Sequence, residues 1–273
     1  MTLPPESSIG FLEWVARLAS VGIVVRTLEV LVNWPFLKNG ELLGWGGIAT
    51  SRFATLRFLQ RLQSHPICVL ALFARLGAAL AVFAVPYGTP QMAVALAVLF
   101  LAQLYYNHRF ATLSYAAEHL LLICLCALLF ASLPGTSETF RGVCLGFIAF
   151  QAALAYTGTA KHKLAKSHWR DGTRLIQIFQ ESAHRFPPLG RFFGAHPRGA
   201  MLATWAVILL HLLFPISLVL PTPVFAAVIA GGLLFHGTLA FTMGLHGFFW
   251  TFAATYPALY FVHLRLGEML GRA

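Results

Sequence analysis

Charged residues are scarce in this sequence. Asp, Glu, Lys and Arg make up 10% of its 273 residues, whereas soluble domains typically contain about 25%. Hydrophobic residues make up 58% of the chain, which is more apolar surface than a soluble globule of this length can bury. The composition therefore excludes an ordinary soluble domain and indicates a chain that faces lipid.

The long apolar stretches also lack period-two alternation. The run from Met92 to Leu104, for example, does not alternate between apolar and polar residues, as the strands of a membrane β-barrel do. In hydrocarbon every backbone polar group must be hydrogen-bonded within the protein, and a helix needs about 20 apolar residues to cross a bilayer core. The sequence therefore predicts membrane-spanning helices.

Cysteines are few, and secretion and metal motifs are missing. The four cysteines all lie within apolar stretches, which does not fit a disulfide scaffold. Met1 to Ser8 lacks the basic start of a cleavable signal peptide. The chain has eleven histidines but no HExxH pattern or other zinc-ligand spacing. We therefore expect neither a disulfide framework, nor a cleaved signal, nor a metal site.

Basic residues gather in one long connection. The formal net charge is +10, and residues 161–198 hold eight of the nineteen Lys and Arg residues. This clustering fits the positive-inside rule of membrane topology, and no base-reading motif interleaves it. We therefore expect the bilayer, and not nucleic acid, as a partner. Within the connection, residues 172–185 predict a short amphipathic helix with Leu175, Ile176 and Phe179 toward the bilayer.

These patterns predict an all-α fold, a polytopic transmembrane helix bundle. Residues 1–273 are expected to form a single integral membrane domain, with 161–198 as a basic amphipathic connection inside it. We expect about eight hydrophobic spans, within a range of about six to nine. They lie at about 11–33, 66–85, 91–106, 112–133, 140–160, 199–220, 223–243 and 245–264.

Ionisable residues within the predicted spans need a reason. A charge at the bilayer centre costs about 2.5–3.5 kcal/mol on insertion scales, so such residues are paired or functional. Arg75 in the second span and Glu118 in the fourth are expected to form a buried polar pair that holds the helices together. Glu118 and His119 form a proton relay in the alternative interpretation. Arg26 and Glu29, three residues apart, are placed to pair on one helical face.

The most specific local pattern runs from Tyr156 to Gly172, with Lys163 and Trp169 between them. One interpretation is a juxtamembrane anchor, with snorkelling lysines and Trp169 in the aromatic belt. In the other, Lys163 is desolvated at the mouth of the bundle and acts as a base. His108, next to Asn107 at a helix end, is either an interfacial histidine or a proton carrier.

Three motifs together resemble a known family. Residues 156–175, YTGTAKHKLAKSHWRDGTRL, resemble the signature of the HTTM family, the transmembrane module shared with vitamin K-dependent gamma-carboxylase. Asn107 and His108 in YYNHRFATL are similar to its Asn-His motif, and the stretch after Phe235 and His236 to its late histidine helix. In order and spacing the three motifs cover the chain from about Tyr105 onward.

The resemblance implies roles for specific residues. The corresponding lysine of the carboxylase is regarded as the base that deprotonates reduced vitamin K, a role that would fall on Lys163, with Asn107 and His108 contacting the reacting groups. A quinol-type lipid would then be the cofactor or substrate, entering sideways from the membrane, and the three residues would converge at the membrane edge. The motif residues implied in binding it are Tyr156, Trp169, Gly172 and His236.

The sequence also differs from the carboxylase. That enzyme has a large additional domain for its glutamate-bearing substrate, and this sequence resembles instead the short bacterial members, which implies the bacterial inner membrane. Peptide carboxylation by this chain alone is therefore not expected, and whether it is an enzyme stays open. We hypothesise an enzyme or maturation factor acting on a quinol-like or peptide substrate. The alternatives are a proton-coupled transporter or channel, and a non-catalytic subunit that holds a membrane or secreted protein partner.

Overall fold

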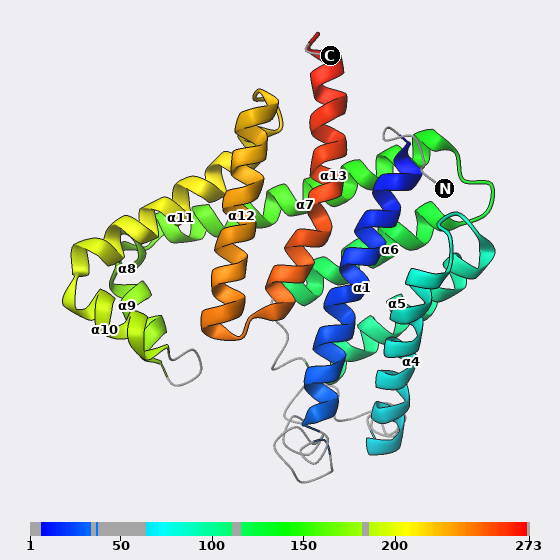
Figure 1. The fold of residues 1–273 in the computed structure, drawn as a ribbon, viewed down its shortest axis with the longest axis horizontal. Coiled ribbons are helices and arrows are strands. Elements are labelled where there is room, and N and C mark those ends of the chain that lie inside the picture. Colours follow the sequence, from blue (N-terminus) through cyan, green and yellow to red (C-terminus); the bar gives the residue numbers. More distant parts are fainter. Residues whose placement is uncertain (1–6, 34–36, 38–63, 111–115, 182–185, 272–273) are drawn as a thin grey trace. The chain divides into compact units, whose positions relative to one another are not determined.

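Every regular element in the described part of the chain is a helix, as the sequence predicts (Figure 1). The computed structural model describes residues 7–33, 37, 64–110, 116–181 and 186–271. Eleven helices lie in these residues: α1 (Ser8–Val32), α4 (His65–Ala84), α5 (Pro90–Arg109), α6 (Ala116–Ser132), α7 (Glu138–Ala165), α8 (Ser167–Arg170), α9 (Thr173–Gln180), α10 (Pro187–Ala195), α11 (Pro197–Ser217), α12 (Thr222–Met243) and α13 (His246–Met269).

Each of the eight predicted hydrophobic segments overlaps one of these helices. Four described helices, α4, α7, α11 and α12, are long and apolar enough to cross a membrane, and α6 is a shorter apolar helix. The chain is thus a helical protein with several candidate membrane spans. The total of eight spans stays a prediction.

The helices divide into two compact units, Met1–Cys144 and Leu145–Ala273. Helix α7 begins in the first unit and continues into the second. The four cysteines are all free, as expected from their place in apolar stretches.

Local signals set the helix starts of the first unit. The Ser7 side chain accepts a hydrogen bond from the backbone N–H of Gly10 at the start of α1, and the backbone N–H of Ser8 donates to the Glu138 carboxylate at 2.8 Å. At α5, Thr89 accepts from the backbone N–H of Met92. Such caps satisfy amide groups that the first helical turn leaves without partners.

In the second unit, helices α8, α9 and α10 occupy the basic connection. Helix α9 covers part of the predicted amphipathic segment, whose residues 182–185 lie outside the described residues. Leu175 and Ile176 are half-buried. Phe179, however, is 5% exposed, and its ring lies 5.9 Å from that of Phe193 on α10. Helix α10 therefore covers the side chain that we expected to face the bilayer.

Candidate functional site

Tyr156 of α7 is the centre of an aromatic cluster in the second unit. Its side chain is 1% exposed, and its ring stacks on Phe214 of α11 with centroids 3.7 Å apart. Phe252 of α13 lies 5.0 Å away at a tilt. One face of α7 thus meets aromatic side chains from two other helices of the same unit.

The Tyr156 hydroxyl belongs to a buried hydrogen-bonded chain. It lies 3.1 Å from His236 Nε2 and 2.9 Å from the Tyr256 hydroxyl. The His236 ring stacks on Phe252 at 4.3 Å. Two of the predicted binding residues, Tyr156 and His236, are therefore in direct contact although 80 positions separate them in the sequence.

One nitrogen of His236 stands out in this chain. The side chain is 3% exposed, and its Nδ1 is buried with no hydrogen-bond partner, the one such side-chain atom among the described residues of the second unit. Buried polar atoms in native proteins are nearly always paired, and an exception points to a functional role or to a bound molecule. His236 Nδ1 is therefore the unpaired polar atom of this cluster.

Gly232 of α12 makes room for the cluster. A Cβ at this position would overlap the Phe214 ring and the Tyr256 hydroxyl. Because glycine lacks that atom, the Phe214 and Tyr256 side chains pack against α12 at this position and contact Tyr156.

His211 of α11 lies beside the cluster, with its ring 5.3 Å from Tyr156 and 5.1 Å from Phe235. Its Nδ1 is 2.5 Å from the carbonyl oxygen of Val207. A carbonyl only accepts, so Nδ1 carries the proton and Nε2 holds the lone pair of the neutral ring. Lys163 is close enough to His211 for the two to interact electrostatically.

Lys163 lies near the end of α7, on the same face as Tyr156. The two residues are seven apart, which is two helical turns and about 10 Å along the axis. Ala160 between them is fully buried. The Lys163 side-chain nitrogen lies 4.5 Å from the centroid of the Trp169 ring, a position for a cation–π contact when the amine is protonated. The predicted base is therefore half-buried under an aromatic ring, about two turns from the Tyr156 cluster.

Gly172 has a structural role in the turn that follows. Its φ is +83°, and a Cβ there would lie 2.7 Å from the carbonyl carbon of Ala200 and 2.8 Å from Met201 Cα. The indole N–H of Trp205 donates to the Arg170 carbonyl at 3.1 Å. These contacts fix the end of α8 and the start of α9 on the first turns of α11.

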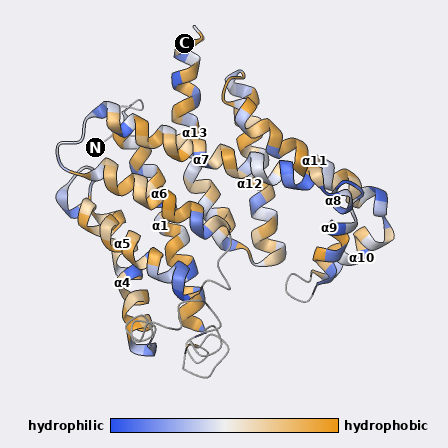
Figure 2. Ribbon diagram, turned by 180° about the vertical axis from the view of Figure 1, so that it is seen from behind, coloured by the Kyte–Doolittle hydropathy of each residue, from blue (hydrophilic) through white to orange (hydrophobic). Residues whose placement is uncertain are grey.

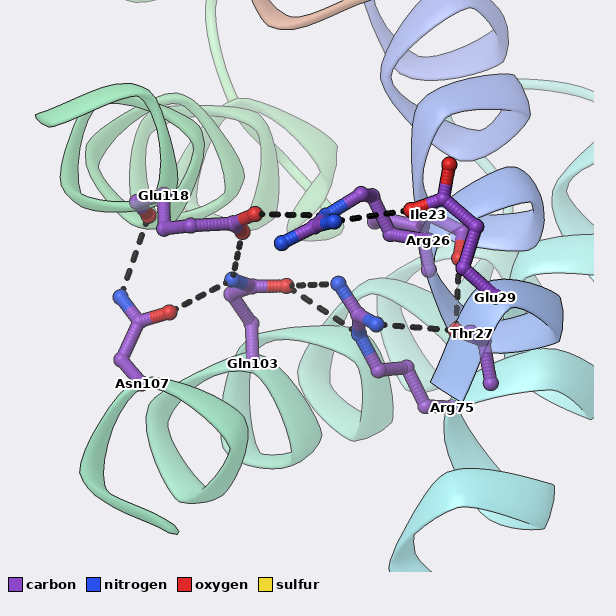
Figure 3. A network of polar contacts seen from close by, with 8 residues as sticks. All are labelled: Ile23, Arg26, Thr27, Glu29, Arg75, Gln103, Asn107 and Glu118. Carbon is purple, nitrogen blue, oxygen red and sulfur yellow. Dashed lines mark hydrogen bonds and ion pairs between the residues drawn. The ribbon is translucent and has the colours of Figure 1, made fainter. Parts of the chain in front are cut away.

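The first unit contains a separate network of buried polar side chains (Figure 3). Arg75 on α4 is fully buried. Its guanidinium donates to the Thr27 hydroxyl at 2.8 Å and to Gln103 Oε1 at 2.6 and 3.2 Å. It also lies 4.1 Å from the centroid of the Tyr106 ring.

Gln103 connects the two residues of the predicted pair. Its amide nitrogen donates to Glu118 at 3.0 Å, while its amide oxygen accepts from Arg75 (Figure 3). The cation that contacts Glu118 directly is Arg26, with Nε 3.2 Å from the carboxylate. Arg26 also pairs with Glu29 at 2.8 Å, as their spacing predicts. Arg75 and Glu118 thus share one network, joined through a neutral amide.

Asn107 is part of the same network. Its side-chain oxygen accepts from Gln103 at 2.7 Å, and its amide nitrogen donates to the backbone carbonyl of Glu118 at 3.1 Å. His108, the next residue, is half-buried. Both residues belong to the first unit and Lys163 to the second. Their convergence with Lys163 stays a prediction.

Sequence reasoning missed Gln103, Tyr256 and Gly232. Two faint signals could have indicated the first two: a glutamine in an otherwise apolar span, and a tyrosine beside Pro257 in the last helix. No group of three or more His, Cys, Asp or Glu that could hold a metal ion occurs among the described residues.

Comparisons with protein-family models, curated proteins and solved structures found no match. The resemblance to the HTTM family therefore rests on the three sequence motifs alone.

Proposed function

We propose that the second unit binds a lipid-soluble molecule with a weakly acidic ring hydroxyl, such as a quinol, and that Lys163 removes its proton. The protein would then be a multi-pass membrane enzyme or maturation factor of the HTTM type, in the bacterial inner membrane. The observation that carries the proposal is the buried His236 Nδ1 without a partner, at the end of a hydrogen-bonded chain on the face of α7 that also bears Lys163.

The cluster has the chemistry to recognise an aromatic, oxygen-bearing ring. The rings of Tyr156, Phe252 and His236 pack on one another and form an aromatic surrounding, and His236 Nδ1 has the chemistry to form a hydrogen bond with a hydroxyl or carbonyl oxygen. Ligand sites typically combine apolar and aromatic walls with a few placed polar groups. A quinol headgroup meets both requirements and reaches the site through the lipid.

The proton step needs a neutral amine on Lys163. Its nitrogen lone pair takes the hydroxyl proton of the substrate, which leaves an ammonium on Lys163 and an anionic oxygen on the ring. The Trp169 ring, 4.5 Å from the nitrogen, favours the ammonium that forms. An interaction that is stronger after the transfer than before it lowers the barrier to that transfer.

For the first unit we infer a scaffold role. Arg26, Arg75, Glu29 and Glu118 balance in charge, and Gln103 and Asn107 link them. A network this fully hydrogen-bonded stabilises one arrangement of its helices, whereas a proton path needs sites that gain and lose protons. This ranks the enzyme hypothesis above the proton-coupled transporter.

The test is the set of lipids that the purified full-length protein retains, identified by mass spectrometry. We expect quinone-type lipids with the wild-type chain and with Lys161→Met, an exposed control on the same helix. His236→Phe should reduce retention by about fivefold, because one hydrogen bond is worth about 1 kcal/mol. Retention of no quinone-type lipid, or equal retention by His236→Phe, would contradict the proposed site.

A further inference from the structure

Exposed cations concentrate on the basic connection, residues 161–198, which runs from the last turns of α7 to the first turn of α11. Five Lys and Arg residues in its described part are exposed: Lys161, Lys166, Arg170, Arg191 and Arg198. Figure 2 shows hydrophilic residues on α8 and α9 beside the hydrophobic α11. The connection is therefore a basic surface attached to an apolar helix.

The counter-charges on this surface are few. Asp171 and Glu181 are the acidic residues of 161–198. Glu181 pairs with Arg174 at 2.6 Å, and the Asp171 carboxylate accepts the backbone N–H of Thr173 at 2.8 Å. The five exposed cations thus outnumber the acids, one of which already pairs with Arg174.

The connection lies at one end of two candidate membrane spans. Helix α7 ends at Ala165 and α11 begins at Pro197. The Trp205 contact to Arg170 and the close approach of Gly172 to Ala200 and Met201 fix the connection against the first turns of α11. Its cations are therefore held at the level where a span leaves the hydrocarbon.

An exposed aromatic side chain accompanies the cations. Phe192 on α10 is 50% exposed and is next to Arg191, while Phe179 and Phe193 of the same segment pack on each other. Segments that lie on membranes combine cations with aromatic or aliphatic side chains that enter the headgroup layer. Phe192 is placed for such a contact.

We propose that the α8–α10 connection binds the anionic phospholipid headgroups of the leaflet that it faces. The phosphates would pair with the exposed lysines and arginines, and Phe192 would insert beside them. Each basic residue near an anionic surface contributes about 1 kcal/mol. This proposal is independent of the quinol site, since it uses none of the cluster residues.

The test uses the full-length protein in phosphatidylcholine vesicles. Tryptophan quenching by brominated phosphatidylglycerol is compared with quenching by brominated phosphatidylcholine, which gives the headgroup preference. We expect a preference for phosphatidylglycerol that Lys166→Gln with Arg191→Gln lowers at least about fivefold. It should also fall in about 1 M NaCl, where the screening length is about 3 Å.

The matched control is Arg17→Gln with Arg265→Gln, which removes the same charge elsewhere. These arginines pair with Glu13 and Glu268 of their own helices, and the control should keep the wild-type preference. Circular dichroism checks that both double variants fold. Equal preference in the wild type and the connection variant would overturn the proposal, as would loss of the preference on adding millimolar inorganic phosphate, which would identify a soluble phosphate ligand instead.

Discussion

Gln103 joins two buried charges that do not touch. Its amide oxygen accepts from Arg75 and its amide nitrogen donates to Glu118 and Asn107. An amide carries both a donor and an acceptor, so it can satisfy a cation on one side and an anion on the other. The buried Arg75 depends on this residue for two of its hydrogen bonds.

Gln103→Leu should therefore destabilise the first unit. Leucine removes two of the hydrogen bonds of Arg75 and leaves it the one to Thr27, it also removes one partner of Glu118, and breaking a buried charge interaction by removing one partner costs about 3–5 kcal/mol. Gln91→Leu, an exposed position on the same helix, should change stability by about 0.5 kcal/mol or less. Unfolding in SDS measures both variants, and equal stability would mean that the network contributes nothing.

Gly172→Ala should also be destabilising, by about 2 kcal/mol, because alanine is strained at positive φ and its Cβ would meet the backbone of α11. Gly158→Ala is the control, since that exposed helical position has no atom within 4 Å of the new Cβ. It should be neutral or stabilising. Thermal unfolding in detergent compares them, and similar melting temperatures would contradict the tight approach at Gly172.

For contacts between single residues, the sequence predicts only those whose partners are close in the chain. The pair of Arg26 and Glu29 follows from helical spacing, and the structure confirms it. The contact of Tyr156 with Tyr256 spans 100 positions, and no local pattern encodes such a distance. The link between Arg75 and Glu118 through Gln103 was missed because it depends on how three helices pack.

Helices are the elements that the sequence predicts best. Long apolar stretches separated by proline and glycine indicate both their existence and their approximate ends, and Pro90, Pro197 and Pro223 lie in first turns. The short helices α8 and α10 were not predicted. They have too few residues for a periodic pattern, and packing on α11 stabilises them.

The packing of α9 on α10 gives a test at the element scale. Phe179→Ala should detach the two helices, because removing a buried phenylalanine costs about 3–5 kcal/mol. Phe192→Ala, at a half-exposed site thirteen positions along the chain, should leave them packed. Limited proteolysis reports the difference as faster cleavage of the Phe179→Ala connection, and equal cleavage rates would contradict this packing.

For the whole molecule, the basic connection fixes the expected orientation in the membrane. The positive-inside rule places residues 161–198 in the cytoplasm, at one end of both α7 and α11. In a background without the four native cysteines, Lys161→Cys and Arg198→Cys should react with a membrane-impermeant maleimide only after the cells are opened. Labelling of either cysteine in intact cells would show the opposite orientation.

The most direct test of the proposed function is base catalysis by Lys163. A deprotonated quinol reduces dioxygen faster than the neutral form, giving quinone and hydrogen peroxide, so oxygen uptake by a naphthoquinol in protein-containing nanodiscs reports the proton step. The wild type and Lys161→Met should accelerate oxygen uptake. In Lys163→Met this acceleration should be about 100-fold smaller, although the variant still binds the quinol. Equal rates for Lys163→Met and the wild type would contradict the assignment of Lys163 as the base.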